Sequence, residues 1–303
     1  MTHLSTKKLI LIAGPTAAGK TAMAIRIAQH FHTSIISADS RQCYKEMKIG
    51  VARPSDEELS AVPHFFIASH SIQEDVTAAV FESYALEKAA ELFKTHDVVV
   101  MVGGTGLYIR AFCEGLDLIP EIPAGIREKI IASYEANGIG WLQQELNLRD
   151  PLFAEKGEMQ NPQRMMRALE VVEATGHSIF SFRRNEKTSR DFEIIKIGLT
   201  LPRDILRQRI DERVDQMMKA GLEAEVRELR PNRHLNALQT VGYQEIFEYL
   251  EGKCRLEDAV ERVKINTRQY AKRQMTWFNR DPEMHWFVPD EWDKILQFID
   301  TSV

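Results

Sequence analysis

The chain has 303 residues, of which 44% are hydrophobic and 27% charged, and its formal net charge at pH 7 is −5. This composition is typical of a globular protein with enough material for one large domain or two, and no apolar run approaches the ~20 residues of a membrane span. The negative charge excludes general attraction to nucleic acid, so any such binding must depend on local basic clusters.

The first part of the chain alternates short apolar strands with helices. Strands are predicted at Leu9–Ala13, Ser34–Ala38 and Val98–Val102, and helices at Ala22–Phe31 and Thr77–Thr95. This alternation predicts a parallel sheet with helices on both of its faces.

Helical periodicity dominates from residue 118 to residue 190. The predicted helices of this segment are Ile126–Asn137, Trp141–Leu148 and Gln163–Thr175, with turn signals between them. A strand returns at Ile194–Leu201, and helices follow at Arg203–Leu229, Gly242–Glu251 and Leu256–Asn279. The sequence therefore predicts an α/β core of residues 1–117 and 191–303, interrupted by an all-helical insertion over residues 118–190.

A phosphate-binding loop is predicted between the first strand and the first helix. It has the spacing G-x-x-x-x-G-K-[ST] and consists of Gly14, Pro15, Thr16, Ala17, Ala18, Gly19, Lys20 and Thr21. The glycines let backbone N–H groups turn inward, Lys20 adds a positive charge, and the following helix presents its positive end to an anion. The loop predicts a site for a phosphate or diphosphate ester, and the alternative is a glycine-rich turn without a ligand.

Two further segments follow predicted strands, at the sheet edge where ligands bind in open α/β folds. Asp39 follows the second strand and can accept a proton or hold a metal, although a turn aspartate is the alternative. The third strand runs into Gly103–Gly106, where a typical P-loop ATPase has a magnesium-binding aspartate. The aspartate that holds magnesium for ATP hydrolysis is therefore missing after this strand. The turn itself can also be explained as a tight strand–helix connection without a ligand.

Basic side chains form local clusters beside aromatic residues. On the last long helix Arg273, Trp277 and Arg280 share a face, and Arg164 and Arg167 share one in the insertion. A third run lies at the end of the insertion and consists of Arg183, Arg184, Lys187 and Arg190. Such clusters suit phosphate backbones and unstacked RNA bases, and solvated helix faces are the alternative.

Six motifs occur in order over nearly the whole chain. They are Gly14–Thr21, Ser37–Gln42, Gly103–Tyr108, Gln163-Arg164-x-x-Arg167-Ala168-Leu169-Glu170, Val241-Gly242-Tyr243, and Tyr270-Ala271-Lys272-Arg273-Gln274-x-Thr276-Trp277. Together they closely resemble the bacterial tRNA dimethylallyltransferase family. The resemblance implies a P-loop NTPase-like parallel sheet core with C-terminal helices and a helical insertion that holds the tRNA anticodon stem-loop.

The resemblance also implies the reaction. The family transfers the dimethylallyl group of dimethylallyl diphosphate to N6 of the adenosine 3′ of the anticodon, position 37 of tRNA, and releases diphosphate with the help of Mg²⁺. The phosphate loop would then hold the prenyl diphosphate. We expect a monomer without a membrane partner, and the three isolated cysteines favour a reducing cytoplasm.

Individual roles follow from the matched motifs. Asp39 matches the general base, Thr105 the contact to the target adenosine, and Arg213 an arginine that supports the diphosphate. Thr21 of the phosphate loop would hold the Mg²⁺. The residues expected to contact tRNA are Asp39, Ser40, Arg41, Gln42, Thr105, Arg127, Gln163, Arg164, Arg167, Lys272, Arg273 and Trp277.

Several positions depart from the family pattern. Ala18 stands where serine is usual, Phe65 and Phe66 stand where a histidine and then an aspartate are common, and Gln239 stands where arginine is frequent. A small-molecule or nucleoside kinase with the same loop is the alternative function, but it leaves the basic C-terminal helix without a role. A non-catalytic RNA-binding module is a third hypothesis, which the intact Lys20, Thr21 and Asp39 disfavour.

Overall fold

The computed structural model describes residues 7–183 and 187–301 of the chain. It divides into two compact units, one formed by residues 1–114 and 189–303 and the other by residues 115–188. The boundaries predicted from sequence, after residues 117 and 190, lie close to these. We call the two parts the core unit and the helical unit.

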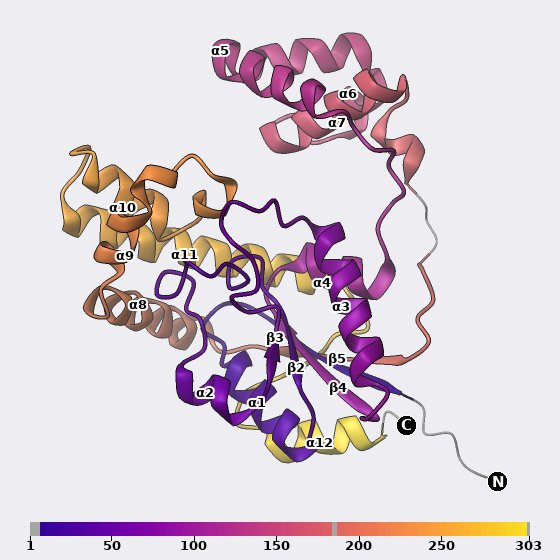
Figure 1. The fold of residues 1–303 in the computed structure, drawn as a ribbon, viewed down its shortest axis with the longest axis vertical. Coiled ribbons are helices and arrows are strands. Elements are labelled where there is room, and N and C mark those ends of the chain that lie inside the picture. The colour runs from indigo at the N-terminus through magenta and orange to yellow at the C-terminus, as the bar shows by residue number, and fades with distance from the viewer. Residues whose placement is uncertain (1–6, 184–186, 302–303) are drawn as a thin grey trace. The chain divides into compact units, whose positions relative to one another are not determined.

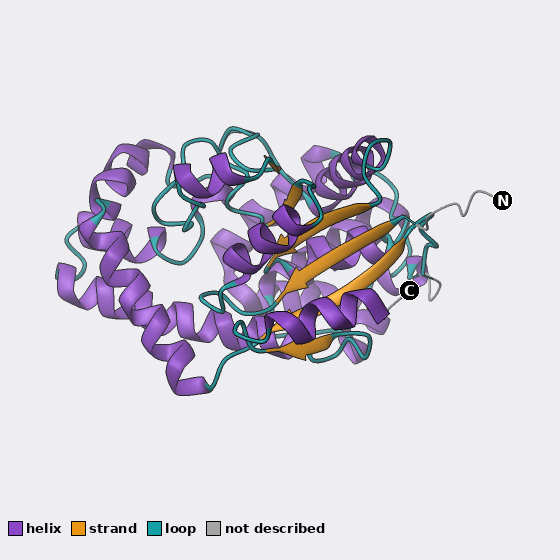
Figure 2. Ribbon diagram, turned by 90° about the horizontal axis from the view of Figure 1, so that it is seen from below, coloured by secondary structure: helices purple, strands orange, loops and turns teal. Residues whose placement is uncertain are grey.

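The core unit contains one sheet of six strands, all of them parallel. Their order is β3-β2-β4-β1-β5-β6, and Figure 2 shows the strands running alongside one another. The bounds are β1 Lys8–Ala13, β2 Ile35–Ala38, β3 His64–Phe65, β4 Val98–Gly103, β5 Glu193–Leu199 and β6 His285–Phe287. The predicted α/β fold is confirmed, whereas the two short edge strands β3 and β6 were not predicted.

Helices cover both faces of this sheet (Figure 1). Leu9 and Leu11 of β1 pack into a core cluster with α3 (Ala78–Leu92) and α4 (Gly106–Glu114). Ile10 and Ile12 point to the opposite face, where α1 (Lys20–His30) and α12 (Trp292–Thr301) pack. The continuous apolar run of β1 is thus explained by burial on two sides. A short helix, α2 (Asp56–Ala61), begins with a capping box between Ser55 and Glu58.

Four longer helices complete the core unit: α8 (Arg203–Lys219), α9 (Leu222–Leu229), α10 (Tyr243–Leu250) and α11 (Leu256–Phe278). Short 3₁₀ helices η2 (Arg230–Asn232) and η3 (Asn236–Leu238) lie between α9 and α10. The prediction of one continuous helix from Arg203 to Leu229 is wrong. Gly221 adopts a φ of 101° and serves as the N-cap of α9, so the chain turns there.

The regular elements among the described residues of the helical unit are all helices: α5 (Ala124–Arg149), α6 (Pro151–Lys156), α7 (Pro162–Thr175) and the 3₁₀ helix η1 (Ile179–Phe182). Leu142, Leu146, Met165 and Leu169 belong to its own buried core, which α5 and α7 build together. Gly138 has non-helical torsions (φ 72°, ψ −169°) that kink α5, where the sequence predicts a break between two helices. In the part of the chain that the structure describes, no helix has both the length and the apolar character to cross a membrane.

Candidate active site at the carboxyl edge of the sheet

The phosphate loop connects β1 to α1 and curls tightly. Gly14 has a φ of 138°, and a Cβ at this position would lie 2.4 Å from the carbonyl oxygen of Leu199, so only glycine fits. Ala17 and Gly19 also adopt positive φ values, of 64° and 88°. Lys20 begins α1 and donates from Nζ to the carbonyl oxygen of Pro15 at 2.7 Å. The lysine therefore folds back over the loop that it follows.

Positive charge accumulates at this loop. Arg213 of α8 donates from Nη1 to Oγ1 of Thr16 at 3.3 Å. Burial, and secondly the charge of Arg213, lower the pKa of Lys20 to about 7, while Asp39 acts in the opposite direction. Burial likewise lowers the pKa of Arg213. Two cations that are disfavoured by their surroundings form a site that an anion would stabilise.

A second arginine of α8 lies beside the loop and was missed by the sequence analysis. The Nη1 atom of Arg209 is 3.9 Å from the place that a Cβ on Gly19 would take. Arg209 precedes Arg213 by four residues, so both side chains lie on one face of α8. That spacing is the signal in the sequence that could have identified it.

Asp39 follows β2 directly and holds its own turn. Its Oδ1 atom accepts hydrogen bonds from the backbone N–H groups of Arg41, at 2.8 Å, and of Gln42, at 3.2 Å. The turn role considered above is therefore real. Oδ2 accepts no hydrogen bond from any described residue, which leaves one oxygen of this carboxylate for another proton.

Thr105 joins the turns that follow β2 and β4. Its N–H donates to the carbonyl oxygen of Ala38 at 3.2 Å, and its Oγ1 accepts from the N–H of Ser40 at 3.0 Å. These bonds bring the turns of Asp39 and Thr105 side by side, as the pairing of Ala38 with Gly103 requires. Burial, with the negative charge of Asp39 as the next cause, raises the pKa of Tyr270 on α11 to about 12.

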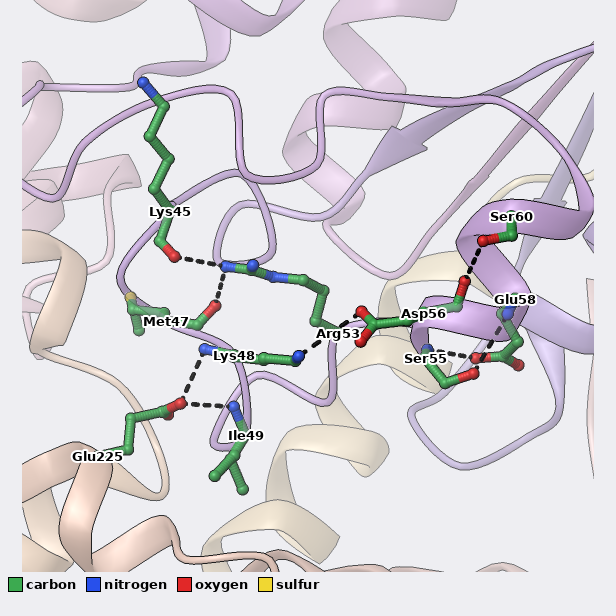
Figure 3. A network of polar contacts seen from close by, with 10 residues as sticks. All are labelled: Lys45, Met47, Lys48, Ile49, Arg53, Ser55, Asp56, Glu58, Ser60 and Glu225. Carbon is green, nitrogen blue, oxygen red and sulfur yellow. Dashed lines mark hydrogen bonds and ion pairs between the residues drawn. The ribbon is translucent and has the colours of Figure 1, made fainter.

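The segment after Asp39 is held from several sides, as Figure 3 shows in part. Glu225 of α9 accepts hydrogen bonds from the backbone N–H groups of Lys48 and Ile49. Arg53 donates to the carbonyl oxygens of Lys45 and Met47. This network anchors the polypeptide that leaves the Asp39 turn to α9, which limits the freedom of the turn itself.

In the core unit, some of the residues expected to contact tRNA have side chains that contact neighbouring segments of the protein, and others are exposed or partly buried. Arg41 donates to the carbonyl oxygens of Asn236 and Ala237, and Gln42 donates to those of Val51 and Ala52. These two side chains support neighbouring loops. Trp277 also packs against a neighbouring segment. A Cβ on Gly106 would lie 2.3 Å from its Nε1 atom, so the indole ring lies against the start of α4. Lys272 and Arg273 are exposed on α11 and Ser40 is partly buried.

In the helical unit Arg127, Gln163 and Arg164 are exposed. Arg164 forms an ion pair with Glu158, and Arg167 one with the buried Glu170 at 3.0 Å. Both arginines belong to α7, which begins after the side chain of Asn161 caps its first turn.

The basic run at the end of the predicted insertion is only partly an exposed cluster. Arg183 stacks its guanidinium on Phe180 in the helical unit, at 4.1 Å from the ring centroid, and Arg184 lies outside the described residues. Arg190, in the core unit, is partly buried and pairs with Glu82 at 2.9 Å while it donates to the carbonyl oxygen of Phe112 at 2.8 Å. Arg190 therefore supports the fold of the core unit through these two contacts.

No group of three or more His, Cys, Asp or Glu side chains in the described residues could hold a metal ion. Thr21, the second residue of α1, offers one hydroxyl group at the phosphate loop. Mg²⁺ commonly keeps several waters and binds to few protein ligands together with substrate phosphates. The residues present therefore fit Mg²⁺ only if a diphosphate completes its coordination.

The departures from the family pattern are accommodated by packing. Ala18 is fully buried in the core cluster of α1, so its methyl group fills space that a hydroxyl would have to share with apolar neighbours. Phe66 is 1% exposed and contacts Phe81 and Tyr84. Gln239 donates to the carbonyl oxygen of Arg233, and its Oε1 accepts from Gln244.

The IPP transferase family model matches residues 42–281. The tRNA dimethylallyltransferase of Christiangramia forsetii is 48% identical over 97% of this chain and 98% of its own length. The tRNA dimethylallyltransferase 1 of Bacteroides fragilis is 44% identical over 99% of this chain and 100% of its own length.

Two solved structures are also similar. One is the full-length tRNA isopentenylpyrophosphate transferase of Bacillus halodurans, with a TM-score of 0.71, 34% identity, and coverage of 98% of this chain and 95% of that one. The other is a eukaryotic dimethylallyltransferase acting on tRNA, with a TM-score of 0.78, 26% identity, and coverage of 95% and 76%.

Proposed function

This chain belongs to the IPP transferase family, and on that premise we propose that it transfers the dimethylallyl group of dimethylallyl diphosphate to N6 of adenosine 37 in tRNA, 3′ of the anticodon. It is a tRNA prenyltransferase. The observation that carries the finer proposal is the placement of a cationic phosphate loop, with Lys20 and Arg213, beside the Asp39 carboxylate.

The phosphate loop stabilises the leaving group in this proposal. The allylic C–O bond breaks and its electron pair departs with the diphosphate, so negative charge grows on the diphosphate oxygens. The loop N–H groups, Lys20 and Arg213 are held in place before the reaction, which is the arrangement that lowers such a barrier most. Mg²⁺ bound beside Thr21 would neutralise part of the same charge.

Asp39 serves the attacking group. N6 of adenosine forms the new bond to the allylic carbon and must lose a proton, which the Oδ2 atom of Asp39 accepts. A stacked base cannot reach a site at the edge of a sheet, so the adenosine has to be flipped out of the anticodon loop. Thr105, hydrogen-bonded beside the Asp39 turn, is the proposed contact for that base.

The contacts to tRNA also belong to the proposal. We assign them to the exposed cations of α11, Lys272 and Arg273, and to Arg127, Gln163, Arg164 and Arg167 of the helical unit. Arg and Lys side chains supply the electrostatic part of RNA binding. We further propose that the enzyme acts as a monomer in the cytoplasm.

The kinase alternative is not favoured. Its metal-binding aspartate is missing, since β4 runs into Gly104 and Thr105, and the relatives named above are tRNA prenyltransferases. Thermal unfolding with dimethylallyl diphosphate or ATP, each with and without Mg²⁺, tests the choice directly. We expect a larger rise in Tm with dimethylallyl diphosphate, whereas stabilisation by ATP alone would favour the kinase.

The lowered pKa of Lys20 predicts a pH-dependent affinity for diphosphate. Because this pKa is about 7 in the free enzyme, Lys20 is increasingly neutral above pH 7, and binding of an anion there requires uptake of a proton. The affinity for diphosphate should therefore fall above pH 7, by up to about tenfold per pH unit. Below pH 7 Lys20 is already protonated, so it should contribute no pH dependence to that affinity. Calorimetry with inorganic diphosphate from about pH 6 to about pH 9 measures both the affinity and the proton uptake.

A Lys20→Arg variant is the control, because arginine does not titrate in this range. Its diphosphate affinity should lack the decline above pH 7. An unmodified enzyme whose affinity and proton uptake are flat over the same range would contradict the role assigned to Lys20.

The proposed contacts of α7 predict a change in salt dependence. Replacement of both Arg164 and Arg167 by alanine should weaken tRNA binding and reduce the slope of log affinity against log salt by about 1.4–1.8, since each lost phosphate contact removes about 0.7–0.9. Affinity for dimethylallyl diphosphate should not change. Arg149→Ala, in the exposed part of α5, is the matched control.

Because Arg167 pairs with a buried glutamate, the Arg167→Ala change also tests stability, and tRNA affinity must be measured well below the Tm of the variant. An unaltered slope in the folded double variant would mean that the two arginines only form a solvated helix face.

A further inference from the structure

We propose that Gln274 is a positioning residue, which sets the distance between the diphosphate loop and the turn that receives the adenosine. Gln274 lies on α11, within the Tyr270–Trp277 motif, and is not part of the phosphate loop. The inference rests on the proposed function, because it concerns how the two substrates of that reaction are held relative to each other.

The side-chain amide of Gln274 joins two segments that are far apart in the sequence. Its Oε1 atom accepts a hydrogen bond from the backbone N–H of Thr16, in the phosphate loop, at 2.8 Å. Its Nε2 atom donates to the carbonyl oxygen of Gly104, at 2.9 Å. A single planar group therefore spans from the diphosphate loop to the residue before Thr105.

The packing around this amide leaves little freedom. Gln274 is 6% exposed, and a Cβ on Gly104 would lie 2.2 Å from Nε2. The glycine at position 104 is thus the space into which the amide fits. A buried amide that uses both its donor and its acceptor has one orientation, since rotation of the group would leave two polar atoms unsatisfied.

Both ends of this bridge lead to groups with roles in the proposed reaction. Thr16 receives the hydrogen bond from Arg213 through its side chain, and Gly104 precedes Thr105, which is bonded to the Asp39 turn at Ser40. Gln274 is thus the short link between the groups that stabilise the leaving diphosphate and those that handle the attacking amine. Reactions of two bound substrates depend steeply on such distances, because only near-attack geometries react.

Gln274→Met tests the proposal, since methionine keeps the approximate length and removes both hydrogen bonds. With both substrates saturating, the single-turnover rate of prenyl transfer should fall roughly 10- to 100-fold. The Kd values for dimethylallyl diphosphate and for tRNA should each stay within about threefold of the unmodified enzyme, because the binding groups themselves remain. Gln269→Met, an exposed glutamine on the same helix, is the matched control and should leave all three quantities unchanged.

The loss of two buried hydrogen bonds also lowers Tm, so rates are compared at a temperature where both proteins are folded. A rate within about threefold of the unmodified enzyme would overturn the proposal, and so would a loss of diphosphate affinity that accounts for the whole rate change. If Gln274→Met does not fold, Gln274→Glu takes its place, because it keeps the acceptor for Thr16 and lacks the donor to Gly104. A normal rate in that variant would overturn the proposal equally.

A double-mutant cycle adds a second, independent readout. Gly104→Ala places a methyl group where the amide of Gln274 lies, so it should lower the transfer rate in the unmodified enzyme. The same change should cost much less in the Gln274→Met background, because the bridge is already absent. Additive effects would contradict the bridge. Absence of transfer by the unmodified enzyme would instead refute the proposed function, so the two failures are distinguishable.

Discussion

Replacement of Asp39 by asparagine is expected to lower the single-turnover rate of prenyl transfer by about 10²–10⁴, the usual contribution of a general base. Asparagine keeps an oxygen that can accept the hydrogen bonds from the N–H groups of Arg41 and Gln42, so the turn should persist. It cannot take the proton from N6. The affinities for tRNA and for dimethylallyl diphosphate should change far less than the rate.

The single-turnover rate, the affinities for the two substrates and the Tm of the Asp39→Asn variant together separate the general-base role from a metal-ligand role and from a purely structural role. A metal-ligand role would weaken diphosphate binding in step with the rate, and added Mg²⁺ would restore part of both. A purely structural role would lower Tm and leave near-normal turnover in the folded fraction. Asp56→Asn, an exposed acid at the start of α2, is the control and should behave as the unmodified enzyme.

The second large effect is expected at Arg213. Removal of one pre-positioned donor to a developing negative charge typically costs about 10²–10³ in rate, and Arg213→Ala should fall in this range. Arg213→Lys should recover little, because a lysine offers a point charge in place of the planar fork that bonds to Thr16 and that we propose to bond the diphosphate oxygens. Rate and diphosphate affinity are measured separately, and the larger loss should be in the rate.

Arg207→Ala provides the matched control for Arg213→Ala, because Arg207 is an exposed arginine of the same helix. The loss of transfer rate in Arg209→Ala should lie between those of Arg207→Ala and Arg213→Ala, since the guanidinium of Arg209 is next to Gly19. Equal, small effects of the Arg207 and Arg213 changes would show that α8 contributes only general positive charge.

The parts of the fold that were predictable from sequence depend on local patterns. The apolar run of β1, the glycine spacing of the phosphate loop and the alternation that follows it are all readable within short windows. The strands β3 and β6 have two and three residues, too few for any periodicity, and they exist because a neighbouring strand offers hydrogen bonds. The break of the predicted helix at Gly221 lies in a run whose composition is otherwise helical.

The loops of the candidate site were predictable from sequence, whereas the side chains of α11 that pack against these loops were not. Asp39 and the phosphate loop follow predicted strands, so their meeting at one edge could be inferred. Gln274 and Tyr270 come from a helix more than 200 residues away from the phosphate loop, and only the folded chain shows which groups they contact. The same holds for Trp277, whose place against Gly106 no spacing in the sequence indicates.

The most direct test of the account is to incubate the enzyme with dimethylallyl diphosphate, Mg²⁺ and unmodified tRNA that has adenosine 3′ of the anticodon, and then to analyse the nucleosides by mass spectrometry. The account predicts a single adenosine, at position 37, that carries a five-carbon prenyl group on N6, with release of diphosphate. Unmodified tRNA after this incubation, together with ATP-dependent phosphorylation of a small substrate, would contradict it.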